Sequence, residues 1–267
     1  MIRLSIAGVS GRMGKTILSL ALEDRSFQIA GGLERADSSD LGRDVGELAE
    51  GKLLQVKVSK EISAVLKDTD VLIDFTHAAV VPDTLKAVLK AGTAYVIGTT
   101  GLGPDLLQEI RKASQKVAIV QSPNMSIGVN LLFGLTALAG KVLDESYDAE
   151  ITEIHHRGKK DAPSGTAMKL LEILAAARRK NTEISAIYGR KGDIGVRPPG
   201  QIGVLASRGG DVVGDHTVSF LGDGERIELT HRASSRDAFA KGALLAAKFA
   251  VKQKSGLFDM RQVLGMV

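Results

Sequence analysis

The chain has 267 residues, enough for one large domain or two modest ones, and 44% of its residues are hydrophobic, 25% charged and 4% aromatic. This composition is typical of a folded globular protein and excludes a disordered or fibrous chain. The absence of cysteine excludes disulfide scaffolds, thiolate metal sites, cysteine nucleophiles and iron–sulfur clusters. Because 35 basic residues nearly balance 31 acidic ones, the charge does not indicate a strongly basic nucleic-acid binder.

The N-terminal segment, MIRLSIAGVSGRMG, has the pattern of a buried strand followed by a glycine turn, and it has no apolar signal core. The sequence also has no uninterrupted apolar run of about 18 residues, the length that a membrane-spanning helix needs. We therefore expect a cytoplasmic protein with no membrane partner and no nucleic-acid partner.

The first 125 residues alternate short β-branched runs with helical patterns. The predicted elements are, in order, strand 4–7, helix 12–24, strand 28–33, strand 54–58, helix 62–67, strand 71–75, helix 81–91, strand 95–97, helix 104–114 and strand 117–120. The strands are nearly continuous in apolar residues, which is typical of a parallel sheet with helices on both faces. The alternation predicts an α/β fold with a Rossmann-like, doubly wound parallel sheet.

The pattern changes near residue 126, which predicts a second domain. The elements expected there are helix 127–143, strand 149–156, polar loop 157–164, helix 165–179, strands 187–189, 204–207, 217–221 and 226–230, and a final helix 236–252. In the last of these strands apolar and polar residues alternate, as in a strand with one buried face. We expect the final helix to return to the first domain.

A glycine-rich turn, GVSGRMG at residues 8–14, lies between the first strand and the first helix. Glycines let the backbone approach a pyrophosphate closely, and the helix N-terminus offers N–H groups and a positive dipole end. The spacing is G-x-x-G-x-x-G instead of the commoner G-x-G-x-x-G, so an ordinary tight turn is the alternative.

An acidic and a basic residue follow the second strand. Glu34 stands 20 residues after Gly14, where an acid accepts hydrogen bonds from the adenosine ribose. Arg35 comes next and can meet a 2′-phosphate, which predicts tolerance of both NAD and NADP. The alternative is that Arg35 is a solvated turn residue.

Two further turns fall at the carboxyl ends of predicted sheet strands, where open α/β sheets bind ligands. They are Gly98-Thr99-Thr100-Gly101 after the fifth strand and Gln121-Ser122-Pro123-Asn124 after the sixth. Two ordinary loops are the alternative interpretation.

The segment HHRGKKDAPSGTA, residues 155–167, places His155 and His156 at a strand end and opens a helix with Ser164, Gly165 and Thr166. The helix start offers N–H groups and hydroxyls, a site for a carboxylate. Imidazole titrates near neutrality, so a histidine beside Lys159 can supply protons to a reacting centre. A solvent-exposed loop with a helix cap is the alternative.

Zinc is a poor fit to this segment, and no metal is expected. Adjacent histidines on a strand point to opposite faces, and no third ligand is expected nearby. We expect the single histidines His77, His216 and His231 to be ordinary surface or core residues. Ser164 lacks the strained elbow of a hydrolase nucleophile.

The motifs GVSGRMG, IDFTH, VIGTTG, SPNMSIGVN, EIHHRGKKDAPSGTA, GDHTVSF and SGLFDMRQVL resemble the dihydrodipicolinate reductase family, in its order and over almost the whole chain. The resemblance implies NAD(P)H-dependent reduction of 4-hydroxy-tetrahydrodipicolinate in the diaminopimelate route to lysine. It also implies a dinucleotide-binding domain, residues 1–126 plus 236–267, and a smaller α+β domain with a mixed sheet, residues 127–235. The second domain would bind the dicarboxylate substrate and assemble a homotetramer.

The resemblance implies residue roles as well. The proton donors would be His155 and Lys159, and the substrate carboxylates would be held by His156, Lys159, Gly165 and Thr166. The residues expected to bind NADH or NADPH are Gly8, Val9, Ser10, Gly11, Arg12, Met13, Glu34, Arg35, Gly98, Thr99, Thr100, Ser122, Pro123, Asn124 and Met125. Where the family often has arginine after Asp-Phe-Thr, this chain has His77.

Two other functions compete with this interpretation. Another two-domain NAD(P) dehydrogenase, of the aspartate or homoserine type, would share the glycine turn but has no evident need for the His-His…Lys…Ser-Gly-Thr segment. A non-catalytic NAD-sensing protein would tolerate loss of His155 and Lys159. Hydride transfer to a dihydrodipicolinate-like substrate distinguishes the three.

Overall fold

The computed structural model describes residues 1–49, 51 and 53–266, which divide into two compact units. Unit 1 combines Met1–Ile127 with Arg236–Val267, and unit 2 is the continuous segment Gly128–Ser235. None of the helices described is long and apolar enough to cross a bilayer. Each unit has its own sheet and hydrophobic core and is described by itself.

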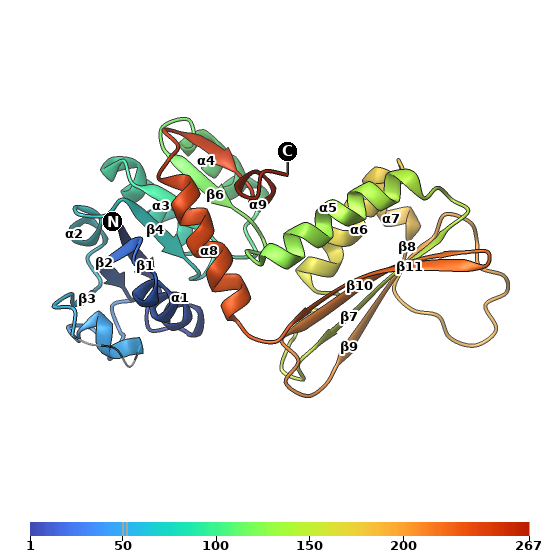
Figure 1. The fold of residues 1–267 in the computed structure, drawn as a ribbon, viewed down its shortest axis with the longest axis horizontal. Coiled ribbons are helices and arrows are strands. Elements are labelled where there is room, and N and C mark those ends of the chain that lie inside the picture. Colours follow the sequence, from blue (N-terminus) through green and yellow to red (C-terminus); the bar gives the residue numbers. More distant parts are fainter. Residues whose placement is uncertain (50, 52, 267) are drawn as a thin grey trace. The chain divides into compact units, whose positions relative to one another are not determined.

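Unit 1 is built on a parallel sheet of seven described strands in the order β12-β6-β5-β4-β1-β2-β3. Its elements are β1 (Ile2–Ala7), α1 (Arg12–Glu23), β2 (Phe27–Leu33), a 3-10 helix η1 (Val45–Ala49), β3 (Val58–Ser59), α2 (Ile62–Leu66), β4 (Val71–Asp74), α3 (Val81–Ala91), β5 (Ala94–Ile97), α4 (Pro104–Ala113), β6 (Ala118–Gln121), α8 (Asp237–Ala250), β12 (Gly256–Phe258) and α9 (Met260–Val263). Figure 1 labels these elements except η1, β5 and β12. The order 3-2-1-4-5-6 confirms the predicted doubly wound sheet.

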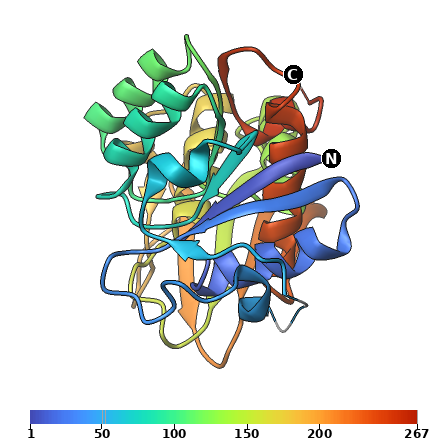
Figure 2. The ribbon, with the colours of Figure 1, turned by 90° about the vertical axis from the view of Figure 1, so that its left-hand side faces the viewer.

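Helices cover both faces of this sheet, as Figure 2 shows for the helices α1 and α8 on one side and α2, α3 and α4 on the other. The α1/α8 side buries Ile17 and Leu18 of α1 together with a row of alanines from α8. Because alanine side chains are short, α8 packs close to the strands. Burial on both faces explains why the strands are nearly continuous in apolar residues.

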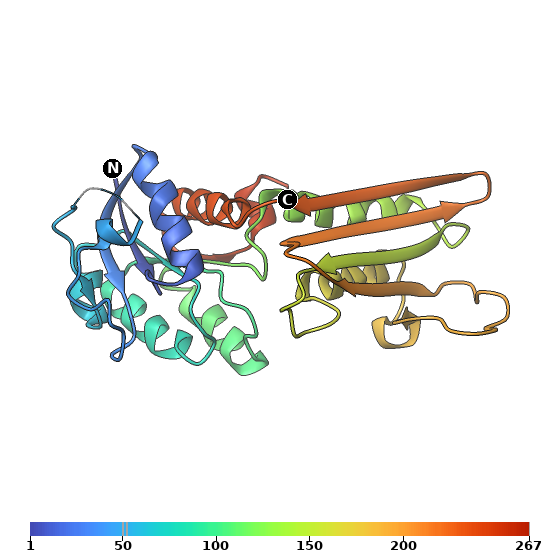
Figure 3. The same cartoon turned by 90° about the horizontal axis from the view of Figure 1, so that it is seen from below.

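Unit 2 has a five-stranded mixed sheet, order β11-β10-β7-β9-β8, with helices against one face. Its elements are α5 (Ile127–Val142), β7 (Asp148–His155), α6 (Gly165–Ala177), α7 (Thr182–Ser185), β8 (Ala186–Ile187), β9 (Ile202–Arg208), β10 (Gly214–Gly222) and β11 (Glu225–Ala233). Figure 3 looks onto the other face of this sheet. The mixed sheet confirms the predicted α+β class of the second half.

Buried and exposed positions alternate along β7 and β10. Ala149, Ile151, Val218 and Phe220 face α5 and α6 and form the core. The opposite face carries threonines and serines with exposed apolar residues between them. Thr217 and Thr230 share a hydrogen bond there, with 3.0 Å between their hydroxyl oxygens.

Two differences from the sequence prediction concern the edges of the unit 1 sheet. The strand predicted at 54–58 is wrong in extent, because only Val58 and Ser59 pair with β2. The closing segment contains β12, which pairs with β6 and was not predicted. Both are edge strands of two or three residues, too short for a hydrophobic period to reveal.

Candidate active site

The glycine turn of unit 1 joins β1 to α1. Gly8 has a φ of +70°, a left-handed backbone that favours glycine, and the N–H groups of Gly8 and Val9 donate to the Leu33 carbonyl oxygen at 2.9 and 3.2 Å. A β-carbon at Gly14 would overlap the Gly8 carbonyl oxygen. The turn and the first residues of α1 are therefore in direct backbone contact, an arrangement that suits a phosphate.

Glu34 follows β2 and reaches this turn. Its Oε1 accepts a hydrogen bond from the Ser10 N–H at 2.9 Å, and its Oε2 accepts one from the Arg35 N–H at 3.3 Å. The Arg35 side chain is 77% exposed and pairs with Asp37 at 3.0 Å. The structure thus brings the acid and the glycine turn together and leaves the Arg35 guanidinium at the surface.

A pocket of about 500 Å³ opens beside these groups. It is lined by Ala7, Gly8, Gly11, Leu33, Glu34, Arg35, Lys60, Ile62, Phe75, Thr76, His77, Val80, Asp83 and Thr84. Lys60 therefore adds a cation to that of Arg35. The sequence pattern does not reveal Lys60, because this residue follows β3, whose bounds differ from the predicted strand.

Asp74, at the end of β4, connects the turns after β4 and β5. Its buried carboxylate accepts hydrogen bonds from the Thr76 N–H at 2.8 Å, the Thr99 hydroxyl at 3.1 Å and the Tyr95 hydroxyl at 2.6 Å. Burial, together with the Asp74 charge, raises the pKa of Tyr95 well above its usual value. A β-carbon at Gly98 would overlap the Phe75 ring, so the second turn lies directly on the first.

The turn after β6 holds its shape through Ser122 and Asn124. The Ser122 hydroxyl donates to the Asn124 carbonyl oxygen at 2.8 Å, and the Ser126 N–H donates to the Asn124 side-chain oxygen at 2.9 Å. Met125 is buried in the unit 1 core. The predicted cofactor residues of unit 1 all follow carboxyl ends of strands in one parallel sheet, so they lie along one edge of it.

In unit 2 a buried polar cluster lies where β7, β9, β10 and α6 meet. Glu153 and His155 come from β7, Arg208 ends β9, His216 lies on β10, and Ser164 is the N-cap of α6. The Glu153 carboxylate contacts His155 Nδ1, and it accepts hydrogen bonds from Arg208 at 2.9 Å and from the Ser164 N–H at 3.0 Å. The rings of His155 and His216 pack edge to face, 5.1 Å between centroids.

This environment sets two protonation states. Burial raises the pKa of the Glu153 carboxyl, but the contact with His155 and the hydrogen bonds from Arg208 and Ser164 outweigh it and lower the pKa to about 2. Burial, followed by the charge of His155, lowers the pKa of His216 to about 4. At neutral pH Glu153 is therefore a carboxylate and His216 is uncharged.

The loop between β7 and α6 places the remaining predicted residues. The Lys159 ammonium donates to Asp161 at 2.9 Å and the Lys159 N–H donates to the His156 carbonyl oxygen at 3.1 Å. Gly165 and Thr166 form the first turn of α6, behind the Ser164 cap, whose hydroxyl accepts from the Ala167 N–H at 3.2 Å. His155, Lys159 and the α6 N-terminus thus belong to one end of the unit 2 sheet.

Spacing along the chain does not reveal Glu153, Arg208 and His216 as site residues, and the expectation that no third metal ligand lies nearby is wrong. Donor atoms of Glu153, His155 and His216 lie within 4.8 Å of one another. The Arg208 guanidinium and the Ser164 N–H both bond to Oε1 of Glu153, and its Oε2 contacts His155 Nδ1. We therefore interpret the group as a hydrogen-bonded cluster. These residues converge from three strands, a convergence that linear spacing does not show.

Two family models match nearly the whole chain. One is described as Dihydrodipicolinate reductase, N-terminus, and matches residues 2–125; the other, Dihydrodipicolinate reductase, C-terminus, matches residues 128–264. The chain is 46% identical to the 4-hydroxy-tetrahydrodipicolinate reductase of Syntrophobacter fumaroxidans over 266 residues, 100% of both chains. It is 47% identical to that of Nitrosomonas europaea, over 99% of this chain and 98% of the other.

Solved structures show the same fold. Dipicolinate-bound dihydrodipicolinate reductase from Paenisporosarcina sp. TG-14 has a TM-score of 0.77, 24% identity and 97% coverage of both chains. Amine dehydrogenase from Mycobacterium smegmatis has a TM-score of 0.61 at 13% identity, over 96% of this chain and 94% of the other. The predicted family is confirmed, and this chain belongs to the dihydrodipicolinate reductases, enzymes that reduce 4-hydroxy-tetrahydrodipicolinate with NADH or NADPH on the route to lysine.

Proposed function

We propose that the carboxyl edge of the unit 1 sheet holds the NADH or NADPH, which supplies the hydride when bound. The glycine turn, residues 8–13, takes the pyrophosphate, and Glu34 and Arg35 take the adenosine ribose. The other proposed contacts are Gly98, Thr99, Thr100, Ser122, Pro123, Asn124 and Met125. Two observations support this assignment: Gly14 contacts the turn closely, and a pocket lies beside Glu34. A dinucleotide needs both a phosphate turn and a cavity.

The proposed site for the substrate's two carboxylates is formed by His156, Lys159, Gly165 and Thr166 in unit 2. The first turn of α6 offers backbone N–H groups and a positive dipole end, and Lys159 adds a cation. The Paenisporosarcina relative was solved with dipicolinate, a planar dicarboxylate, which supports a dicarboxylate site in this chain.

His155 and Lys159 are the proposed proton donors. Loss of water from the 4-hydroxy ring leaves a conjugated cyclic imine; hydride addition at its C4 moves electron density to C3, where a proton must be added. An imidazolium or an ammonium can give that proton and takes one back from water afterwards. The observation that carries this proposal is the position of His155, buried at the end of β7 beside the cap of α6, where a carboxylate would dock.

Lys159→Ala tests the proposal. Losing a charge-assisted contact that forms mainly in the transition state costs roughly 3 kcal/mol, so we expect kcat to fall about a hundredfold. The affinity for NADH, measured by fluorescence titration, should change by less than about twofold because the cofactor residues belong to unit 1. Lys160→Ala is the matched control and should keep its rate. Unchanged turnover in Lys159→Ala would remove this residue from the site.

We also propose a homotetramer that assembles through the uncovered face of the unit 2 sheet. Ile154, Leu205 and Leu221 are 42%, 37% and 37% exposed, an apolar surface that a second copy can bury. A cytoplasmic location is proposed as well, because the reaction consumes a reduced pyridine nucleotide within amino-acid biosynthesis.

A further inference from the structure

The buried carboxylate of Glu153 faces the same side of the sheet as His155, because the two residues are two positions apart on β7. Its side chain is 0% exposed. Oε1 accepts two hydrogen bonds, from the Ser164 N–H and from Arg208, while Oε2 contacts His155 Nδ1. One carboxylate therefore connects the proposed proton donor to the helix cap beside it.

We propose that Glu153 is a positioning residue that keeps a hydrogen on His155 Nδ1 and so makes Nε2 the atom that exchanges the proton. This inference rests on the role proposed above for His155. An ionised carboxylate only accepts hydrogen bonds, so the nitrogen that it contacts must be an N–H. The requirement holds for both the neutral imidazole and the imidazolium, so the ring keeps one orientation as its proton leaves and returns.

The charge and the space around the ring fit this role. The guanidinium of Arg208 neutralises the buried carboxylate, and it also donates to the Asp161 carbonyl oxygen at 2.7 Å, which fixes the loop that carries Lys159. Nε2 faces Gly214 on β10, where a β-carbon would lie only 2.9 Å away. The glycine therefore leaves room at the nitrogen that the proposal assigns to proton exchange.

Glu153→Gln places an N–H donor against His155 Nδ1 in place of an oxygen acceptor. The amide oxygen must face the two donors, Arg208 and the Ser164 N–H, so the amide NH2 faces His155. Nδ1 then has to accept, the hydrogen of the neutral ring moves to Nε2, and the imidazolium would place an N–H against another N–H. Glu153→Asp keeps a carboxylate, so Nδ1 must still carry a hydrogen.

The experiment combines kinetics with nitrogen-15 NMR of the histidine rings in the full-length protein, the His155 signals being assigned by their loss in His155→Asn. In the wild type we expect the hydrogen of the neutral ring on Nδ1, and in Glu153→Gln on Nε2. We expect kcat to fall about a hundredfold or more in Glu153→Gln, with the KM for NADH within about twofold, and Glu153→Asp to recover part of the rate.

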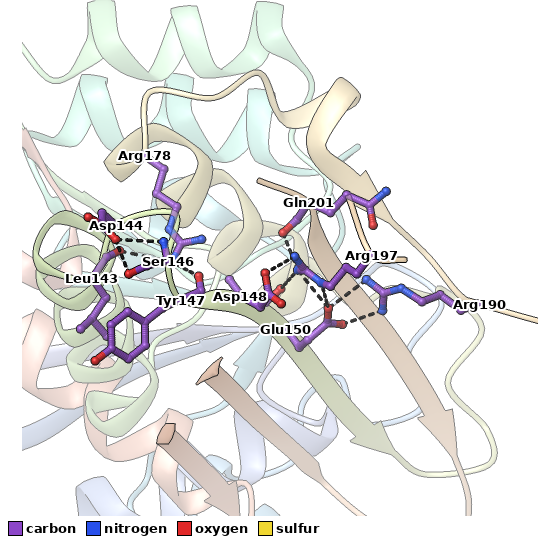
Figure 4. A network of polar contacts seen from close by, with 11 residues as sticks. Leu143, Asp144, Ser146, Tyr147, Asp148, Glu150, Arg178, Arg190, Arg197 and Gln201 are labelled. Carbon is purple, nitrogen blue, oxygen red and sulfur yellow. Dashed lines mark hydrogen bonds and ion pairs between the residues drawn. The ribbon is translucent and has the colours of Figure 1, made fainter. Parts of the chain in front are cut away.

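Glu150→Gln is the matched control on the same strand. Glu150 also pairs with arginines, Arg190 at 2.9 Å and Arg197 at 3.2 Å, in a network that belongs to the other face of the sheet (Figure 4). We expect Glu150→Gln to leave both kcat and the tautomer of His155 unchanged.

The outcomes separate this inference from the function on which it rests. Full activity in His155→Ala would overturn the role of His155 itself. A rate loss in His155→Ala together with an Nδ1 that carries no hydrogen in the wild type would overturn only the role of Glu153. If Glu153→Gln does not fold, the wild-type tautomer and the rate of Glu153→Asp decide the question.

Discussion

Glu34 and Arg35 place opposite charges at the proposed ribose site. In that site Glu34, which holds the Ser10 N–H, would accept hydrogen bonds from the ribose hydroxyls and repel a 2′-phosphate, while the exposed Arg35 would attract that phosphate. At such a site each charge contact is worth about 1–2 kcal/mol. We expect Arg35→Ala to lower kcat/KM for NADPH selectively, about fivefold to thirtyfold and less at high salt, and Glu34→Ala to lower kcat/KM for NADH. Equal losses for both cofactors would show that these residues only support the turn.

His216 makes the stability of the protein depend on pH. Its pKa is about 4 in the folded chain, against about 6.5 in an unfolded one, so protons bind the unfolded state more readily. Its contribution is complete above about pH 6.5 and decreases as the pH falls toward about 4, by about 2 kcal/mol at pH 5. Urea unfolding at pH 7 and pH 5 measures this difference in the free energy of unfolding, and His216→Asn should remove the contribution of His216. His77→Asn, at an exposed site, is the control and should leave the pH dependence unchanged.

The sequence predicts the positions of residues that follow strand ends, and it does not predict which residues meet where several strands come together. The glycine turn, Glu34 and the His155 segment follow from spacing relative to strand ends. Glu153, Arg208 and His216 form one cluster across three strands, and the register that aligns His155 with Arg208 is a property of the folded sheet. The spacing of residues along the chain does not show which residues that register places side by side.

Among the elements, α8 depends on a glycine. A β-carbon at Gly242 would overlap the Met125 carbonyl oxygen, so the helix needs glycine there to lie on the chain after β6. We expect Gly242→Ala to lower the free energy of unfolding by about 3 kcal/mol, since the atoms that must move are backbone. Gly103→Ala is the control, because a β-carbon there meets open space; alanine at this N-cap of α4 costs only about 1 kcal/mol or less. Denaturant unfolding measures both, and equal effects would contradict the packing argument.

Long elements with a clear periodicity of hydrophobic residues are predicted within a few residues of their observed ends. Helix 127–143 is observed as Ile127–Val142, and strand 149–156 as Asp148–His155. The elements that escaped prediction, η1, α7, β12 and α9, have five residues or fewer. They are too short to show a period, and contacts with the rest of the fold determine them.

At the scale of the whole molecule, the proposed tetramer predicts where a charge is not tolerated. Ile154→Glu combined with Leu205→Glu puts two carboxylates on the uncovered face of the unit 2 sheet, where they would be buried between copies. We expect light scattering to show a smaller species than the wild type. Leu107→Glu, at a comparably exposed site (39%) on α4, should leave the mass unchanged. A tetramer that survives the double substitution would place the interface elsewhere.

The division of unit 1 into two chain segments has a consequence for biosynthesis of the protein on the ribosome. Unit 2 is continuous, so it can fold as soon as it emerges, whereas unit 1 waits for α8 and β12, which complete its core and pair with β6. Until then the nascent chain exposes the apolar surface that α8 will cover, and such surfaces attract chaperones and proteases. A transcript truncated after unit 2 should therefore yield a product that is degraded, even though it contains every residue proposed to contact cofactor or substrate.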